Sequence, residues 1–382
     1  MRILLAHSFY RRPGGEDRYV MQQFELLSQR HQVKLLEARN RDLKSGIQTV
    51  AAAAYSKHRR EQAAKTIRDV DPDVVHLHNP YPSLGPAVHL ASRELGVPLI
   101  VTVHNFRLRC PNGFMFTEGA ICRRCEDGAY LSAVVHDCFP DRSQSAAYAA
   151  FLWFHRFVLC LEDKVEKFVA PSQFVRHRLI DWGISAERTE TIPHFVESVP
   201  DPSSPGRVGV YIGRISPEKG VGVLLRALSL AGDPVFRIAG DGPARLQAEA
   251  LARDLGLRHT QFLGRLPVQR IYQLLEESRY LVMPSVWEET FGLSALEAMG
   301  HARPIVVSAL GGLAELVRDD VGVTCVPGDA NDLAEKITFL ERDAEFCRSA
   351  GDQAWNLCRR EYSAEVHLSR LETMYGACLS ST

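Results

Sequence analysis

Short apolar runs alternate with longer segments of helical periodicity along the whole chain. The apolar runs predict buried strands at Ile3–Ala6, Gln32–Leu36, Val74–His78, Leu99–Val103, Phe168–Ala170, Thr189–Ile192, Val208–Ile212, Val235–Ala239, Gln261–Leu263, Tyr280–Met283 and Pro304–Val307. The helical periodicity predicts helices at Tyr19–Gln29, Val221–Ala231, Ala244–Leu255, Asn331–Arg342 and Ala364–Ala377. Strands that alternate with helices are typical of βαβ units and parallel sheets.

One Pro/Ser/Gly-rich stretch, Val199–Gly206, interrupts this alternation and is the best candidate for a linker. A length of 382 residues fits two domains. We therefore predict an α/β fold with two Rossmann-like, doubly wound domains, 1–198 and 207–360, that face each other across a cleft. The last segment, 361–382, is predicted as a helix that packs back on the N-terminal domain.

The composition is that of a globular protein, with 46% hydrophobic and 24% charged residues. A net charge of −1 argues against nucleic acid as a partner. No apolar run approaches the roughly 20 residues that span a bilayer. The apolar start, Met1–His7, is too short for a signal peptide and is better interpreted as a strand, so we predict a cytoplasmic protein.

Two glutamates in the C-terminal half carry the most informative chemistry. Glu289 and Glu297 are separated by seven residues, and Phe291-Gly292-Leu293 between them can open a helix. The free amides of a first helical turn bind anions such as phosphate. A carboxylate further along the helix can accept hydrogen bonds from the hydroxyls of a ribose. An amphipathic helix with acidic residues near its start would produce the same pattern, since the helix dipole favours them there.

The segment Glu289-Thr-Phe-Gly-Leu-Ser-Ala-Leu-Glu297 resembles the Glu-x7-Glu signature of glycosyltransferase family 4. The stretch Arg303–Val317 continues the family pattern, with Ala302 at a position that is often Gly in the family. A member of this family has the GT-B fold. It transfers a sugar from a nucleoside-diphosphate donor to a hydroxyl acceptor with retention of anomeric configuration.

A second segment, Gly213-Arg214-Ile-Ser-Pro-Glu-Lys219-Gly220, resembles the Gly-Arg-Leu…Glu-Lys-Gly element of the same family. The resemblance implies that Arg214 and Lys219 bind the donor diphosphate, and cations there would stabilise the charge on the leaving group. It also implies that no metal is needed for catalysis. The loop expected to contact the base of the donor, which can be UDP-, GDP-, ADP- or TDP-linked, is Gly264, Arg265 and Leu266.

The resemblance further assigns the two acidic residues and the helix between them. Glu297 would hold the ribose, and Glu289 would bind sugar hydroxyls and support positive charge at the anomeric carbon. The amides near Phe291, Gly292 and Leu293 would bind the phosphates. No general base is evident, because in such enzymes the leaving phosphate is thought to take the acceptor proton on the same face.

The N-terminal half carries weaker signals at its strand ends. Gly14 and Gly15 resemble the Gly-Gly loop with which the family approaches the sugar and the acceptor, although a plain turn fits equally well. His104 follows a strand and matches a family histidine beside the donor sugar. His76 and His78 are better interpreted as structural. His194 stands where the family usually has Asn, which puts a polar contact there in doubt.

Four of the nine cysteines are grouped in an insert at about 105–140, in the order Cys-x11-Cys-x2-Cys-x12-Cys. They are Cys110, Cys122, Cys125 and Cys138. Four thiolates would satisfy a structural zinc site, with His136 as a spare ligand. Free or partly disulfide-bonded thiols remain the alternative. A subset of family 4 enzymes looks similar from His104 to Gly113.

The segment Ala147–Lys167 is rich in aromatic and basic residues, so it is either a core helix or a face that lies on a membrane near a lipid-linked acceptor. Membrane contact would then be peripheral, at the inner face. Two other functions stay open: a phosphorylase or nucleotide-sugar epimerase on the same scaffold, and a non-catalytic zinc-dependent binding protein.

Overall fold

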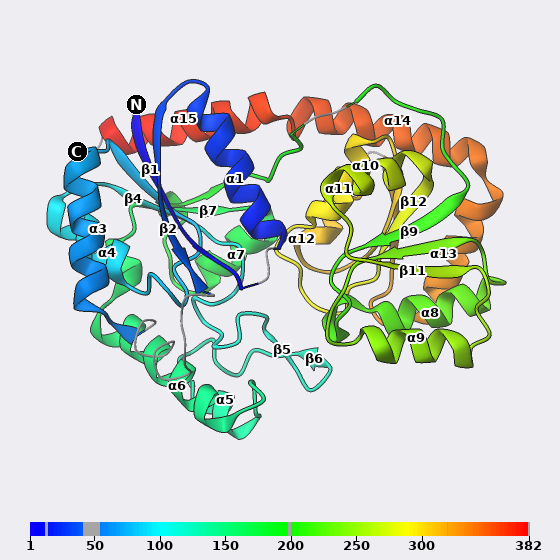
Figure 1. Ribbon diagram of the computed structural model, residues 1–382, viewed down its shortest axis with the longest axis horizontal. Coiled ribbons are helices and arrows are strands. Elements are labelled where there is room, and N and C mark those ends of the chain that lie inside the picture. Colours follow the sequence, from blue (N-terminus) through cyan, green and yellow to red (C-terminus); the bar gives the residue numbers. More distant parts are fainter. Residues whose placement is uncertain (12–13, 41–53, 198–199, 319, 381–382) are drawn as a thin grey trace. The chain divides into compact units, whose positions relative to one another are not determined.

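The computed structural model describes residues 1–11, 14–40, 54–197, 200–318 and 320–380. Its contacts divide the chain into two compact units, shown with their elements in Figure 1. Unit 1 contains Met1–Glu118, Cys122–Pro193 and the residues from His367 onward. Unit 2 contains Gly119–Ile121 and His194–Val366. The second unit thus begins ahead of the linker at Val199–Gly206, which has no helix or strand in its described residues from Pro200 to Gly206.

Unit 1 is built on a six-stranded parallel sheet with the order β2-β1-β3-β4-β7-β8. Its strands are β1 (Arg2–Phe9), β2 (Gln32–Arg39), β3 (Val74–Leu77), β4 (Leu99–Thr102), β7 (Lys167–Ala170) and β8 (Thr189–Thr191). β3 and β4 are buried at every position. Burial on both faces explains why the central strands are continuous apolar runs rather than alternating ones.

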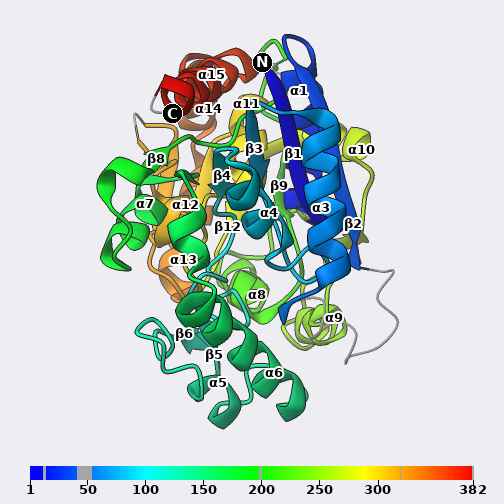
Figure 2. The same cartoon turned by 90° about the vertical axis from the view of Figure 1, so that its left-hand side faces the viewer.

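Helices cover both faces of this sheet. They are α1 (Gly15–Ser28), α3 (Lys57–Val70), α4 (Ala87–Leu95), α7 (Gln173–Asp181) and α15 (Ala364–Ser380). Gln23 of α1 and Tyr375 of α15 both contact Nδ1 of His76 on β3, so these two helices share a face. Figure 2 looks onto α3 and α4, which lie in front of the strands on the other face. The C-terminal helix therefore packs on unit 1 through buried side chains.

The insert between β4 and β7 has little regular structure. It contains the two-residue strands β5 (Phe116–Thr117) and β6 (Ala120–Ile121), the four-residue helix α5 (Ser132–Val135), α6 (Arg142–Trp153), a π-helical turn η2 (Phe154–Val158) and a 3-10 turn η3 (Leu161–Lys164). A further 3-10 turn, η4 (Ala186–Arg188), precedes β8. In the aromatic segment, Phe151 and Leu152 are buried, whereas Trp153 and Phe157 are about half exposed. The segment is therefore mainly a core helix with two exposed rings at its end.

Unit 2 repeats the design with a parallel sheet of order β11-β10-β9-β12-β13-β14. The strands are β9 (Val208–Ile212), β10 (Phe236–Ala239), β11 (Thr260–Gly264), β12 (Ser278–Met283), β13 (Ile305–Ser308) and β14 (Gly322–Cys325). The helical elements are η5 (Pro217–Lys219), α8 (Val221–Leu230), α9 (Arg245–Asp254), α10 (Val268–Glu277), α11 (Leu293–Gly300), α12 (Gly311–Ala314), α13 (Ala330–Arg342) and α14 (Ala344–Glu361).

Two apolar clusters fill unit 2, one on each face of its sheet. One joins side chains of α8, α9 and α13 with alternate strand residues such as Tyr211 and Val282. The other joins α10, α11 and α14 with residues such as Val210 and Leu281. Neighbouring strand residues point to opposite faces, so each cluster takes every second residue of a strand. The prediction of two doubly wound α/β domains is confirmed.

Candidate functional site

The order of the strands in unit 2 reverses between β9 and β12. From β9 the chain proceeds to β10 and β11 on one side, and after β12 it proceeds to β13 and β14 on the other. Ligands of open α/β sheets bind at such a switch point, beyond the carboxyl ends of the strands. The loops that follow the two strands, 213–220 and 284–292, contain Arg214, Lys219 and Glu289.

These two loops make direct backbone contact. The Val286 amide donates a hydrogen bond to the Glu218 carbonyl at 2.9 Å. Gly220 has φ +70°, and a Cβ atom there would lie 1.9 Å from the carbonyl oxygen of Pro284. Only glycine satisfies both the left-handed backbone and this approach. The glycine of the Glu-Lys-Gly motif is therefore explained by how closely the loops meet.

Lys219 and Glu289 form an ion pair across the two loops. The Lys219 Nζ lies 2.6 Å from Oε1 of Glu289, and the Ser285 hydroxyl donates to the same oxygen at 2.6 Å. The ammonium also lies 5.1 Å from the centre of the Trp287 ring. The side chains are 18% and 8% exposed for Lys219 and Glu289. The structure thus brings together two of the predicted site residues, which are 70 positions apart.

Arg214 is held by a carboxylate of its own loop. Its guanidinium contacts Oε1 of Glu218, and the Ser216 hydroxyl donates to that oxygen at 2.6 Å. Burial raises the pKa of Glu218, but the hydrogen bond from Ser216 and the charge of Arg214 outweigh it, and the pKa lies below its ordinary value. The Arg214 side chain remains 46% exposed, so a solvent-borne anion can reach it.

The helix predicted to start at Phe291-Gly292-Leu293 is confirmed. Gly292 is the N-cap of α11, with φ +127°, and a Cβ there would lie 2.5 Å from Leu313. Glu289 precedes the helix, and Glu297 lies in its second turn with a partly buried side chain. The two acidic residues therefore come from different elements, a loop and a helix.

The loop expected to contact the base follows β11. Gly264 ends the strand with φ +69°, and its carbonyl accepts a hydrogen bond from the Gly240 amide at 2.8 Å. Arg265 is exposed, and Leu266 packs against an apolar cluster of unit 2. Gly213, at the end of β9, donates to the Ala239 carbonyl at 3.0 Å. These contacts place the loops at the same end of the sheet, and the role of the loop toward a base stays a prediction.

Two histidines meet at the strand ends of unit 1. Nδ1 of His78, after β3, lies 2.9 Å from Nε2 of His104, after β4, and the two rings are stacked. His76 is completely buried between Thr102 and Tyr375 at 2.7 Å from each, and burial lowers its pKa to about 3. His76 is thus a structural residue. His78 is a direct partner of His104, which the sequence did not indicate.

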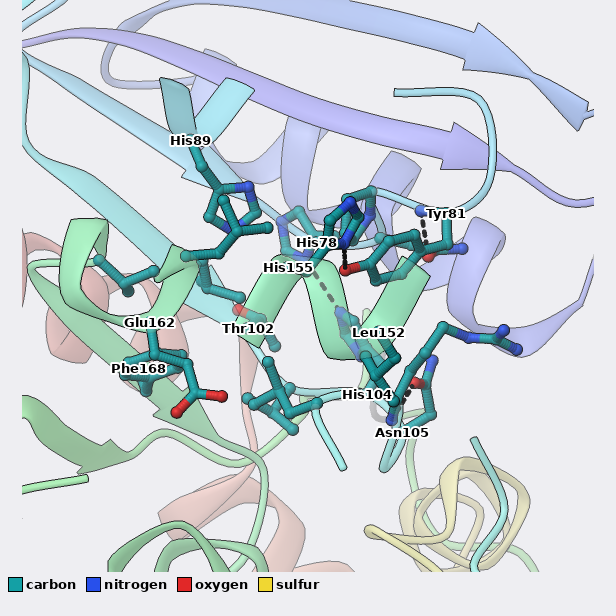
Figure 3. Close-up of a pocket in the computed structure, with 18 of the residues that line it drawn as sticks. His78, Tyr81, His89, Thr102, His104, Asn105, Leu152, His155, Glu162 and Phe168 are labelled. Carbon is teal, nitrogen blue, oxygen red and sulfur yellow. Dashed lines mark hydrogen bonds between the residues drawn. The ribbon is translucent and has the colours of Figure 1, made fainter. Parts of the chain in front are cut away.

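A cavity of about 660 Å³, open solvent included, begins at these histidines (Figure 3). His78, Tyr81, His104 and His155 lie along it as Figure 3 draws them. Tyr81 shares a hydrogen bond of 2.9 Å with Nδ1 of His155. Arg107 also lines the cavity. The cavity therefore offers hydrogen-bonding groups along a largely apolar wall.

The predicted glycine loop after β1 starts α1. Gly14 is the N-cap in an extended conformation, its amide donates to Asp17 at 3.0 Å, and Gly15 is the first helical residue. A Cβ at Gly14 would meet nothing within 4 Å, so packing alone does not require glycine. The preceding Pro13 lies outside the described residues. Asp17 also contacts Nε2 of His7 at 2.9 Å.

Sequence reasoning missed several side chains that position the predicted residues at the strand ends of each unit. They are Ser216, Glu218, Ser285 and Trp287 in unit 2, and His7 and Asp17 in unit 1. Ser216 and Glu218 stand inside the quoted motif, which was the available signal. His194 stacks edge-on against Phe291 at 5.1 Å, so this position contributes a ring contact where the family usually has Asn.

The four grouped cysteines line one small cavity in the insert. All are free thiols. Burial, followed by the nearby thiols of Cys110, Cys138 and Cys122, raises the pKa of Cys125 to about 12. Over the described ranges, no group of three or more His, Cys, Asp or Glu side chains is arranged to hold a metal ion.

In the same ranges, every helix is too short or too polar to span a lipid bilayer.

Two family models match the chain, one for each unit. Residues 13–198 match the model described as Glycosyltransferase Family 4, and residues 200–356 match the model of Glycosyl transferases group 1. Among solved structures, a glycosyltransferase from Rickettsia africae ESF-5 has a TM-score of 0.71 at 16% identity, covering 100% of this chain and 99% of its own. HepE of Anabaena, solved with UDP and glucose, has a TM-score of 0.69 at 19% identity and covers 99% and 100%.

Curated relatives agree at higher identity over shorter spans. Alpha-D-kanosaminyltransferase of Streptomyces kanamyceticus is 28% identical over 299 residues, 75% of this chain and 72% of the relative. Glycogen synthase of Mycobacterium tuberculosis H37Rv is 29% identical over 290 residues, 73% and 62%. The uncharacterized glycosyltransferase MJ1178 of Methanocaldococcus jannaschii is 32% identical over 145 residues, 38% and 41%. The matches to the last two thus span less than two thirds of those proteins.

With one family model on each unit and GT-B structures as neighbours, this chain is a GT-B glycosyltransferase of the family 4-like type.

Proposed function

We propose that this chain transfers a sugar from a nucleoside-diphosphate donor to a hydroxyl acceptor, with retention of anomeric configuration. The observation that carries the proposal is the Lys219–Glu289 pair at the switch point of unit 2. A carboxylate and a cation at the carboxyl ends of adjacent strands are placed for a ligand that carries both hydroxyls and phosphates.

Arg214, Lys219 and the amides at the start of α11 would bind the diphosphate. As the glycosidic bond breaks, the departing diphosphate gains charge, and fixed cations and helix amides stabilise it. Arg214 and Lys219 would exchange their carboxylate partners for phosphate when the donor binds. We propose that this cationic site replaces a catalytic metal.

The acidic groups would bind the sugars of the donor. Glu297 would accept hydrogen bonds from the ribose hydroxyls, and Glu289, which already accepts from Ser285, would bind the transferred sugar. The diphosphate would take the acceptor proton, so no general base is assigned. His104, held by His78, keeps its family role beside the donor sugar as part of the proposal.

UDP-sugars are the first donors to test, because HepE was solved with UDP and with UDP-glucose. GDP-, ADP- and TDP-sugars belong in the same panel. The relatives include an alpha-D-kanosaminyltransferase and a glycogen synthase, so the acceptor panel should contain both small molecules and polysaccharides. A lipid-linked acceptor reached by peripheral contact at the inner face of a membrane remains part of the proposal.

Two measurements test the function in sequence. Ligand-linked stabilisation predicts that at least one of the four donor types raises the Tm. Nucleoside diphosphate should then be released from that donor only when a hydroxyl acceptor is added, and the product should keep the anomeric configuration of the donor. A flat thermal response to every donor overturns the proposal. Acceptor-independent isomerisation of the donor would instead favour an epimerase, and transfer to inorganic phosphate would favour a phosphorylase.

A further inference from the structure

Four of the nine cysteines face one cavity, and the other five do not. The cavity is lined by Cys110, Cys122, Cys125 and Cys138 together with backbone and side chains of the insert. The remaining cysteines lie elsewhere in the fold and do not line it: Cys160, Cys325, Cys347, Cys358 and Cys378. This clustering is unlike the buried cysteines of an ordinary core, which are spread over its helices and strands.

Tight turns begin at two of these cysteines, Cys110 and Cys125. The Gly113 amide donates to the Cys110 carbonyl at 2.9 Å, and the Gly128 amide donates to the Cys125 carbonyl at 3.0 Å. Cys110 and Cys125 are buried, 8% and 7% exposed. Gly113 and Gly128 both have positive φ values, +80° and +96°. Cys122 and Cys125 have the Cys-x2-Cys spacing that is typical of structural zinc sites.

The residues next to Cys110 and Cys125 are bonded to α7 and η3 of unit 1. Glu126, next to Cys125, accepts from Nε1 of Trp182 at 3.2 Å. Arg109, next to Cys110, pairs with Glu162 at 2.9 Å and donates to the Trp182 carbonyl at 2.9 Å. Both anchors meet at Trp182, at the end of α7. The turns are therefore held from outside the cavity, as metal-binding loops are when hydrogen bonds from neighbouring residues orient them.

Arginines near the sulfur atoms are paired with carboxylates: Arg109 with Glu162, Arg123 with Glu126 and Arg124 with Glu118. The guanidinium of Arg124 donates to Sγ of Cys122 at 3.7 Å, and Arg109 and Arg123 line the cavity. His136, the spare ligand suggested by spacing, instead lies 3.2 Å from a Glu118 carboxylate oxygen and is not among the lining residues. The sulfur set alone has the composition of a four-thiolate site.

We propose that Cys110, Cys122, Cys125 and Cys138 bind one structural Zn²⁺ ion as four thiolates. Each thiol loses its proton to solvent, four Zn–S bonds form, and no electron is transferred. Since the described residues hold no group already set to hold a metal, the thiols turn toward a common point in the cavity as the ion binds. The ion would cross-link an insert whose only strands are two residues long.

The cross-link also reaches the larger cavity. Arg107 donates to the carbonyls of Pro111 and Asn112 at 3.1 and 3.3 Å, and it lines the cavity that contains His104. Fixing the Cys110 turn would therefore fix Arg107. The metal would act on structure, and the proposal does not depend on glycosyl transfer.

Metal analysis of the purified full-length chain is the first test. Under reducing conditions we expect about one Zn²⁺ per chain, and at least roughly tenfold less in Cys122→Ser or Cys125→Ser. Cys160→Ser is the matched control, because Cys160 lies in the same unit outside the cavity. It should retain the full metal content. Equal metal in the Cys122→Ser variant and the wild type would overturn the proposal.

A second measurement on the unaltered chain guards against variants that fail to fold. After chelation, titration with Co²⁺ should saturate at one equivalent and produce thiolate-to-cobalt charge-transfer bands with tetrahedral d–d bands. Added Zn²⁺ should bleach them and raise the Tm above that of the chelated protein. Absence of these bands from a chain with four reduced thiols overturns the assignment. The assignment would also be overturned if the protein, purified under reducing conditions, contained disulfides between the four cysteines.

Discussion

At the scale of single residues, Lys219 of the Lys219–Glu289 pair has one structural role and one proposed functional role. The carboxylate is 8% exposed, so it needs a cation, and the proposed reaction needs the same cation on the diphosphate. Removing one partner of a buried pair leaves the other charge uncompensated, which is worse than removing both. The pair therefore allows the structural and the functional role to be separated by mutation.

We predict that Lys219→Met lowers kcat/KM by about 100-fold or more, in line with loss of one transition-state cation. It should also lower the free energy of unfolding by about 1–3 kcal/mol, because Glu289 loses its partner. Lys219→Met combined with Glu289→Gln should regain part of the stability and none of the activity. Urea titrations and steady-state kinetics measure the two effects.

Lys336→Met is a suitable control for the first prediction. Lys336 pairs with Asp332 on the surface of α13 at 3.3 Å, and such pairs contribute little to stability. Its substitution should leave kcat/KM unchanged. If Lys219→Met and the double variant were equally stable, the ion pair would not hold Glu289, and the site geometry would need another explanation.

The sequence predicted which residues stand near the site better than it predicted their partners. The motifs named Arg214, Lys219 and Glu289, and they lie at the strand ends as expected. The Ser216 and Ser285 hydroxyls hydrogen-bond the Glu218 and Glu289 carboxylates. Ser216 stands inside a quoted motif but the resemblance assigned it no role, and Ser285 stands outside the quoted segments. Lys219 and Glu289 are 70 residues apart, and they pair because two loops fold against each other. Such a contact belongs to the tertiary structure and leaves no local pattern in the sequence.

At the scale of elements, the loop after β9 meets the loop after β12 at Gly220. Both a left-handed φ and a close carbonyl restrict this position. Gly232, after α8, has a similar φ of +83° but nothing within 4 Å of a Cβ atom. The two glycines therefore share a backbone penalty and differ only in the clash.

We predict that Gly232→Ala lowers the free energy of unfolding by about 1 kcal/mol, the cost of a left-handed alanine. Gly220→Ala should lower it by at least about 2 kcal/mol more, because its Cβ would force the Pro284 carbonyl away. Donor binding should weaken in Gly220→Ala alone, since the loops that carry Lys219 and Glu289 separate. Urea titration and donor-dependent thermal shifts test both parts. Equal stability losses would contradict this account.

Most strands were predictable because they are buried on both faces and stand out as apolar runs. The exceptions are instructive. β14 (Gly322–Cys325) is an edge strand that is only partly buried, so it has no continuous apolar run. β5 and β6 are two residues long and depend on their turns. At Ala302, where the family often has Gly, φ is +56°, so the departure noticed in the sequence falls on a left-handed backbone.

At the scale of the whole chain, the order of strands and helices predicted two Rossmann-like units, but their membership needed the structure. The linker at Val199–Gly206 marked the change of unit only approximately, because the contacts divide at Pro193 and His194. The last helix joins unit 1 through His367 and Tyr375, which contact Tyr19 and His76. A helical periodicity alone does not say which sheet it covers.

Buried histidines are distributed unequally between the units. Burial lowers the pKa of four in unit 1: to about 3 for His76 and His89, and to about 4 for His155 and His367. In unit 2 one described histidine, His301, has its pKa lowered, to about 4. A folded pKa below the unfolded value of about 6.5 means that the unfolded chain binds more protons between these values. Stability therefore falls as the pH falls through this window.

We predict that acidification from about pH 6.5 to about pH 5 destabilises unit 1 before unit 2. Each such histidine contributes about 1.4 kcal/mol per pH unit in this window, so unit 1 has the steeper dependence. Carboxylates titrate mainly below it. Hydrogen exchange resolved by peptide, with rates corrected for pH, should show opening of β3, β4 and α15 at a pH at which β9 and β12 remain protected.

His89→Leu is the matched variant, because Nδ1 of His89 has no hydrogen-bond partner within the described residues. The substitution should reduce the pH dependence of the stability of unit 1 by one proton and leave the pH dependence of unit 2 unchanged. Simultaneous opening of both units, or earlier opening of unit 2, would show that these histidines do not control the acid response.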